Sequence, residues 1–236
     1  MIIYELEKLY FKQGIHATKF ECKFRNECSK NHEKFTEAKS ASVPSKYETS
    51  IPRIAFLSLD SGSGDKEIKE RTPEGVRAEN ESHIVAQLKK GQHWYETHFW
   101  ATKIINSIGE MNIDITDSKY YFAHLNSAKC CQNKPNHRQA DNILFQNCNQ
   151  YLKEELKIII PQILISQGVK ATESLMSICT LEEKFKSGIS LIKVDNIKML
   201  HFSTYHPSAY GYYYKQKKSI NEILDELKFQ FKIKMW

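Results

Sequence analysis

The chain has 236 residues, of which 41% are hydrophobic and 26% charged, as is usual for a soluble globular protein. No apolar run approaches the roughly 18 residues that span a bilayer, which argues against a membrane protein. The first residues lack the charged and apolar regions of a signal peptide, so we expect a cytoplasmic protein. The net charge of +6 favours a polyanionic partner, because lysines and arginines release counterions from phosphates. The alternative is a solvated surface that is simply rich in lysine.

Six cysteines occur in this chain without a secretion signal. Disulfide frameworks belong mainly to secreted proteins, so the cysteine content does not indicate one. Cysteine clusters of intracellular proteins more often hold a metal, and these cysteines are therefore candidate metal ligands.

The predicted elements begin with residues 1–34, a helical lead-in that runs into a turn rich in cysteine and lysine. Residues 35–52 are polar and are predicted to be a connecting loop. The apolar residues 53–59 form a buried strand that ends in a glycine-rich turn. Residues 66–82 are highly charged and contain proline and glycine, which predicts another loop.

The rest of the chain alternates helices with strands. Further strands are predicted where short apolar runs meet turn residues; they cover residues 120–126, 161–167 and 198–204. Helices are predicted where apolar side chains recur at helical spacing; they cover residues 83–108, 139–158, 169–178 and 219–231. Apolar strands separated by helices indicate a parallel sheet covered on both faces. We therefore predict an α/β fold in one domain (residues 1–236), a three-layer αβα sandwich with a central four-stranded parallel sheet.

Chemically versatile side chains follow three of the predicted strands. Asp60 comes after the first strand, Asn126 ends the second, and His206 follows the fourth. In parallel α/β sheets, ligands bind at the carboxyl ends of the strands, so we expect these three side chains to share a site. Each also has a simpler interpretation: a turn aspartate bonded to its own backbone, a strand-end cap, and a loop histidine before proline.

Several short motifs occur in a fixed order along the second half of the chain. They are Asn126-Ser-Ala-Lys129-Cys130, then Pro135-Asn136-His137-Arg138, then Cys148, then a strand-to-helix unit from Pro161 through Gly168 to Ala171, and finally His206-Pro207-Ser208. Their order, spacing and strand context, from about residue 20 to residue 215, resemble the iron–sulfur branch of the uracil-DNA glycosylase superfamily.

The resemblance implies an enzyme that hydrolyses the N-glycosidic bond of a base flipped out of DNA and leaves an abasic site. Breaking this bond gives the sugar oxocarbenium character and leaves negative charge on the base. By resemblance, Asp60 positions water and stabilises the cationic sugar, while His206 donates a hydrogen bond to the departing base. Asn126 presents a donor and an acceptor to the base edge. No lysine stands out as a Schiff-base nucleophile, so we expect a monofunctional DNA glycosylase.

The first catalytic motif departs from the family pattern. The iron–sulfur members have Gly-Glu-Ala-Pro-Gly and the better-known uracil enzymes have Gly-Gln-Asp-Pro-Tyr, whereas this chain has Ser58-Leu59-Asp60-Ser61-Gly62. Ser61 and Gly62 are candidate base-binding residues, and their small side chains leave room for an attached sugar. Uracil therefore stays open as the substrate, and so does glucosylated hydroxymethylcytosine, which some superfamily members excise in antiphage defence.

By the same resemblance, a [4Fe–4S] cluster is expected, because thiolates hold such clusters in sets of four. The expected ligands are Cys22, Cys28, Cys130 and Cys148, so residues 1–34 form a cluster-binding segment. The expected role of the cluster is structural, clamping this segment onto the core. Zinc also accepts four thiolates, and Cys131 is an adjacent alternative to Cys130.

A tyrosine-rich run that ends in lysines follows His206. In the family, the loop at this place enters the minor groove, a task that suits aromatic wedges with flanking lysines. The candidate DNA-binding residues are Arg138, Ser208, Tyr210 and Lys215. The alternative for the tyrosine-rich run is a solvated helix start.

Two other functions stay open. The first is a non-catalytic iron–sulfur protein of the same fold that binds nucleic acid without the chemistry of Asp60 and His206. The second is a glycosylase-like protein that traps the sugar covalently through a loop histidine, for which His137 lies in a comparable region. DNA is the expected partner in each case, and the protein is expected to be a monomer.

Overall fold

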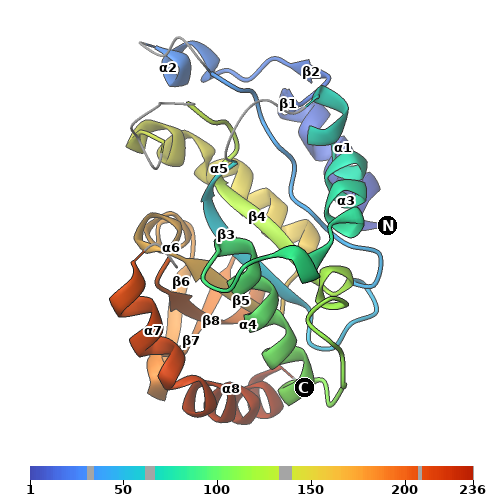
Figure 1. Cartoon of the computed structure of the whole chain (residues 1–236). Helices are drawn as coiled ribbons and strands as arrows, with labels where there is room; N and C mark the ends of the chain where they lie inside the picture. Colours follow the sequence, from blue (N-terminus) through green and yellow to red (C-terminus); the bar gives the residue numbers. More distant parts are fainter. Residues whose placement is uncertain (31–34, 62–66, 133–139, 207–208, 236) are drawn as a thin grey trace.

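A computed structural model of the chain describes residues 1–30, 35–61, 67–132, 140–206 and 209–235. Its centre is a six-stranded sheet in the order β4-β3-β5-β8-β7-β6 (Figure 1). The strands are β3 (Ile54–Asp60), β4 (Phe122–Ala128), β5 (Ile163–Gln167), β6 (Thr180–Lys184), β7 (Ser190–Val194) and β8 (Ile197–Thr204). A separate two-stranded ribbon joins β1 (Ile15–His16) to β2 (Lys19–Phe20).

The four predicted strands are confirmed as β3, β4, β5 and β8, and they pair in parallel. The predicted four-stranded sheet is nevertheless wrong, because β7 pairs antiparallel with β8 and β6 pairs antiparallel with β7. Every residue of β6 is exposed. A strand that buries neither face lacks the apolar pattern by which strands are predicted, so β6 is recognisable only from its pairing with β7.

Helices cover both faces of the sheet and complete the three predicted layers (Figure 1). The helices are α1 (Ile2–Lys12), α2 (Arg25–Ser29), α3 (Pro73–Ser82), α4 (His93–Ile108), α5 (Asn142–Ile159), α6 (Val169–Met176), α7 (Tyr210–Lys218) and α8 (Ile220–Lys234). Alternate residues of β3 serve the two layers, as strand geometry requires. Ala55 and Leu57 pack with α1, α5 and α6, whereas Ile54 and Phe56 pack with α4 and α8.

Two predictions between β3 and α4 are wrong. Residues 66–82 contain the 3-10 helix η1 (Ile68–Arg71) and α3 rather than only a loop. Thr72 caps α3 by accepting a hydrogen bond from the Gly75 backbone N–H, and Pro73 occupies the first turn; both are standard signals of a helix start. The helix predicted from residue 83 begins only at His93.

The N-terminal segment is fastened along the free edge of β4. Thr36 pairs with Cys131 and Ser42 pairs with His124 as isolated antiparallel bridges. The Tyr10 hydroxyl on α1 accepts from the Ala41 N–H at 2.9 Å and donates to Glu155 on α5 at 2.6 Å. These contacts hold α1 against both the sheet edge and α5.

The parallel strands place Asp60, at the end of β3, Asn126, in β4, and His206, after β8, toward the same edge of the sheet. Asp60 and Asn126 lie in neighbouring strands, with Ser58 paired with Asn126 in the ladder. Gly168 follows β5 with φ +97° and ψ 165°, and a Cβ added there would lie 3.6 Å from the His206 Cβ. Within the described ranges, no helix combines the length and apolar character needed to cross a membrane.

Replacing Gly168 with alanine is expected to destabilise the protein by about 1–3 kcal/mol, because its backbone conformation is essentially restricted to glycine. Gly211 is the matched control, since it lies in α7 and an added Cβ there meets nothing within 4 Å. Gly211→Ala should stabilise by roughly 0.5 kcal/mol through helix propensity. Urea denaturation measures both variants, and equal stability of Gly168→Ala and wild type would contradict the expectation.

Candidate active site and cysteine pocket

A cavity of about 390 Å³ lies at the carboxyl ends of β3 and β4. Its walls come from these two strands, residues 39–42, α3 and the start of α4. Asp60, Ser61 and Asn126 all line it, so three of the predicted site residues are brought together. The cavity is therefore the candidate active site.

Asp60 is oriented by the segment that leads into α5. Its Oδ2 atom accepts a hydrogen bond from the Ala140 backbone N–H at 2.9 Å. This partner lies 80 positions along the chain from Asp60. One carboxylate oxygen is thus tied to the β4–α5 connection while the side chain lines the cavity.

Asn126 is 6% exposed and lines the same cavity. Its backbone carbonyl accepts from the Lys129 Nζ at 2.7 Å, which fixes the end of β4. No hydrogen bond joins its side-chain amide to another residue in the described part of the chain. Both the donor and the acceptor of this amide are therefore available to a ligand in the cavity.

His206 is not among the residues that line the cavity, but its imidazole ring stacks on that of His93, which does. The two rings stack with their centroids 4.9 Å apart and their planes 10° apart, and His93 itself lines the cavity. Burial lowers the pKa of His206. Burial, and to a lesser extent the nearby His206, lowers the pKa of His93 to about 4. Both rings are consequently uncharged near neutral pH.

The Ser58 hydroxyl is the centre of a polar network that includes His93. Its oxygen lies 3.2 Å from Nε2 of His93 and 2.8 Å from Nε2 of His124, and it donates to Oε1 of Gln167 at 2.8 Å. The amide nitrogen of Gln167 donates in turn to Thr97 Oγ1 at 2.9 Å. Because the serine proton is used on Gln167, the lone pairs of Ser58 accept from both histidines.

The far side of the cavity is also polar, and the sequence did not single it out. Lys39 lies 3.2 Å from Glu79 on α3, and Asn80 on the same helix donates to Ser42 Oγ at 2.6 Å. Burial, and to a lesser extent the charge of Arg71, lowers the pKa of Lys39 to about 8. Glu79 and Asn80 were not predicted because residues 66–82 were expected to be a loop, although Thr72 and Pro73 signal a helix there.

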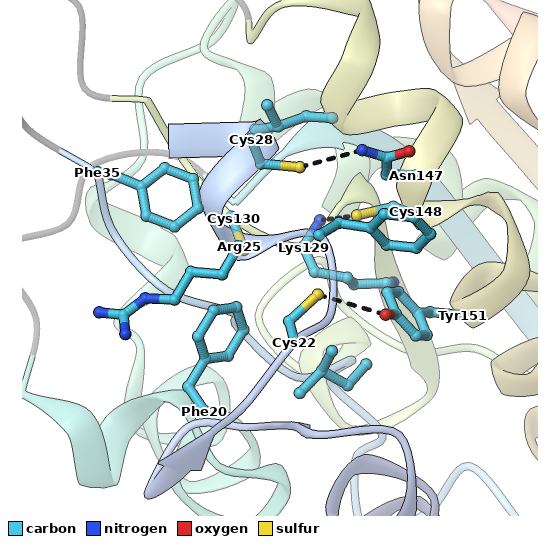
Figure 2. A pocket seen from close by; sticks show the side chains of 13 residues that line it. Phe20, Cys22, Arg25, Cys28, Phe35, Lys129, Cys130, Asn147, Cys148 and Tyr151 are labelled. Atoms are coloured by element: carbon cyan, nitrogen blue, oxygen red, sulfur yellow. Dashed lines mark hydrogen bonds between the residues drawn. The ribbon is translucent and has the colours of Figure 1, made fainter. Parts of the chain in front are cut away.

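A second, smaller pocket gathers four of the cysteines. Cys22, Cys28, Cys130 and Cys148 all line it (Figure 2). The hydroxyl of Tyr151 lies 3.3 Å from Cys22 Sγ, the amide of Asn147 donates to Cys28 Sγ at 3.4 Å, and the Lys129 N–H donates to Cys148 Sγ at 3.3 Å. Cys131 is also buried but does not line this pocket. The pocket therefore brings together the four predicted ligands, and it contains Cys130 rather than Cys131.

The chemistry of this pocket suits a cationic group. Burial raises the pKa of Cys148 to about 12, and burial together with the other three cysteines raises the pKa of Cys130 well above its ordinary value. Such thiols ionise only when positive charge is brought to them. In the described part of the chain, no three His, Cys, Asp or Glu side chains have the arrangement that holds a single metal ion.

One ion pair lies between the two pockets. Lys129 and Glu155 are 1% and 0% exposed and are in direct contact. Lys129 lines the cysteine pocket (Figure 2) and holds the Asn126 carbonyl, while Glu155 accepts from Tyr10. The backbone between Asn126 and Cys130 therefore belongs to both sites.

Comparison with known proteins agrees with this arrangement. The family model of the uracil DNA glycosylase superfamily matches residues 83–228, more than half of the chain. The chain belongs to the uracil DNA glycosylase superfamily. Membership indicates DNA glycosylase activity in general, and therefore DNA as the partner. A search of curated proteins finds no match.

The matched region of this superfamily member includes Asn126, His206, Cys130 and Cys148 but starts after Asp60. Lys215, a candidate DNA contact, is exposed on α7. The other predicted contacts, Arg138 and Ser208, lie outside the described residues, as do the base-binding candidate Gly62, the alternative nucleophile His137 and the Tyr210 side chain.

The tyrosine-rich run divides between core and surface. Tyr213 is 1% exposed and donates to Glu96 at 2.6 Å. Tyr212 is 67% exposed and stacks on Tyr205, with ring centroids 5.4 Å apart. Part of the run is therefore structural, and the exposed pair next to His206 is the part available to DNA.

Buried histidines should make the stability of the protein depend on pH. Burial lowers the pKa values of His93, His98 and His201 from 6.5 to about 4, so the unfolded chain binds more protons than the folded one between these values. Stability should be greatest above pH 6.5 and fall as the pH drops toward 4, by about 1.4 kcal/mol per pH unit for each histidine.

The midpoint of urea denaturation, measured from pH 7.5 to pH 5, tests this expectation. His201→Gln removes one titrating group and should make the decline shallower. A pH dependence as steep in this variant as in wild type would show that His201 does not contribute.

Proposed function

We propose that the protein is an iron–sulfur DNA glycosylase that hydrolyses the N-glycosidic bond of a flipped-out base and leaves an abasic site. The observation that carries the proposal is the cavity lined by Asp60, Asn126 and His93, together with the stacking of His206 on His93. A flipped nucleotide requires a concave pocket with groups that recognise the base and groups that stabilise the charges of bond cleavage.

Each of these residues has a distinct task in the proposed reaction. The Asp60 carboxylate positions the attacking water and stabilises the oxocarbenium character of the sugar. The uncharged ring of His206 donates a hydrogen bond to the oxygen of the departing base, where negative charge develops. The free amide of Asn126 pairs with the edge of the base. No lysine is needed for this chemistry, which makes the enzyme monofunctional.

The dimensions and lining of the cavity bear on the choice of base. At roughly 30 Å³ for each non-hydrogen atom, the share of one molecule in liquid water, uracil needs at most about 240 Å³. The cavity of about 390 Å³ therefore has room for a substituent. Lys39, Glu79 and Asn80 offer donors and acceptors to hydroxyl groups. These features favour a cytosine with a polar substituent over uracil. Glucosylated hydroxymethylcytosine, with about 21 non-hydrogen atoms, needs up to roughly 630 Å³ by the same measure, so its sugar would have to extend beyond the cavity.

The rim beside His206 suits contact with the duplex. Tyr205 and Tyr212 expose a stacked pair of rings, and Lys215 adds an exposed positive charge on the same helix as Tyr212. Aromatic side chains stack on or between bases without regard to sequence, and lysines neutralise phosphates.

Asp60→Asn should reduce cleavage at least about 100-fold, because it removes the charge that stabilises the cationic sugar. The measurement counts alkali-labile abasic sites in three DNAs: unmodified, uracil-containing and glucosyl-hydroxymethylcytosine-containing. We expect cleavage of the glucosylated DNA by wild type. Asp225→Asn is the matched control, since Asp225 is exposed on α8 and should leave activity unchanged.

Each other outcome has a definite meaning. Cleavage of only the uracil-containing DNA would replace the proposed base. Intact DNA binding without cleavage of any substrate would favour the non-catalytic nucleic-acid binder. A protein–DNA adduct that survives denaturation would instead indicate covalent trapping of the sugar.

We propose a [4Fe–4S] cluster for the cysteine pocket. The donor set fits such a group, because four thiols from three parts of the chain line one pocket and thiolates bind iron–sulfur clusters in sets of four. Two buried cations support thiolates there: Lys129 is 1% exposed, Arg71 is 3% exposed, and the charges of Cys130 and Cys131 act on Arg71. A bound cluster would supply a covalent clamp between the N-terminal segment and α5.

Purified protein should be brown and contain iron and acid-labile sulfide in equal amounts. Cys148→Ser should lose the colour and the iron, because it removes one of the four ligands. Cys131→Ser and Cys179→Ser are the controls, since neither residue lines the pocket, and both should keep the full iron content. Colourless protein with one zinc ion per chain would overturn the cluster while leaving the glycosylase proposal intact.

A further inference from the structure

His93 lies between the proposed catalytic histidine and the polar network under the cavity. One face of its ring covers His206, with the centroids 4.9 Å apart. The edge of its ring reaches Ser58, with Nε2 3.2 Å from the hydroxyl oxygen. As the first residue of α4, it is held by a helix that packs in the core through Trp100 and Ile104.

The network fixes the proton on Nε2 of His93. Ser58 uses its own proton on Gln167, whose amide nitrogen is committed to Thr97, so Ser58 must accept from His93. The other ring nitrogen, Nδ1, is buried and has no hydrogen-bond partner among the described residues. A second proton at Nδ1 would create a buried positive charge without an acceptor, which is strongly unfavourable. His93 is therefore held as a neutral ring of one tautomer.

We infer that His93 is a positioning residue that acts as a neutral plate: it shields one face of His206 from water and holds that ring uncharged and in place. The inference rests on the proposed function of His206 as the donor to the departing base. An uncharged donor matters here because the sugar beside the base becomes cationic, and a charged imidazole would repel it. Burial, which lowers the pKa of His206, is the physical cause.

Other charged groups near the pair are already neutralised or lie on the far side. His124 on β4 is buried, and burial lowers its pKa well below the ordinary value. Glu96, one turn along α4, is held by Tyr213 and by Lys217 from α7, each at 2.6 Å. Lys39 is paired with Glu79 across the cavity, and Asp60 lines the cavity at the end of β3. On α6, which follows β5, Lys170 is paired with Glu173.

Two substitutions distinguish the effect of the stacked ring of His93 from the effect of its hydrogen bond to Ser58. His93→Phe keeps a flat ring over His206 but cannot donate to Ser58, whereas His93→Gln keeps a donor but removes the ring. The titration of His206 is followed by NMR in the full-length, histidine-labelled protein, with His206→Asn to assign the signal. We expect the midpoint to stay within about 0.3 units of wild type in His93→Phe and to rise by roughly one unit in His93→Gln.

The acid limb of the cleavage rate should move to higher pH by the same interval in His93→Gln, since His206 then becomes charged at a higher pH. A midpoint that rises equally in both variants would assign the effect to the hydrogen bond and overturn the inference, as would no rise in either. Should His93→Gln not fold, His93→Leu is the second variant, which fills the space without a flat ring and should also raise the midpoint.

The NMR titration does not require catalysis. If the protein is inactive but His206 titrates with the expected midpoints, the proposed function is contradicted while the shielding of His206 stands. If the protein is active but His206 titrates identically in all variants, only this inference is contradicted.

Discussion

The buried contact between Lys129 and Glu155 connects the parts of this molecule that carry its chemistry. Removing one partner of such a pair typically costs about 3–5 kcal/mol, because the other charge remains buried without compensation. Here the pair also reaches outward: Glu155 accepts from Tyr10 on α1, and Lys129 holds the carbonyl of Asn126. Helix α1 and the backbone of β4 at Asn126 are therefore both held by one buried charge pair.

This arrangement connects the cysteine pocket to the cavity through a short stretch of backbone. Only three residues separate Asn126 from Cys130, and Lys129 between them contributes to both sites. If the thiols hold a cluster, its bonds to Cys22 and Cys28 tie the N-terminal segment to the same stretch of backbone that presents Asn126. In that case the cluster would help to hold the end of the strand that carries Asn126.

The sequence predicted those features that depend on apolar patterns. The four parallel strands are short apolar runs, and the edge where Asp60, Asn126 and His206 gather follows from their parallel order. Features made by exposed or polar residues were not predictable in this way. The strand β6 buries neither face, and α3 is mostly charged, so its contribution of Glu79 and Asn80 to the cavity emerged only from the fold. The spacing of the cysteines in the sequence also could not decide between Cys130 and Cys131 as the pocket residue, because adjacent residues are distinguished only by the direction in which the backbone orients their side chains.

The lowered pKa values of the histidines at the cavity are suited to a protein that binds a polyanion. DNA phosphates raise the pKa of any nearby histidine, because they stabilise its charged form. A histidine that has to stay neutral in the complex therefore needs a pKa below the ordinary value in the free protein. Burial supplies this for His206, and it lowers the pKa of His93 to about 4. The net positive charge of +6 thus attracts DNA through surface lysines and arginines, while the imidazoles around the cavity remain uncharged donors and acceptors.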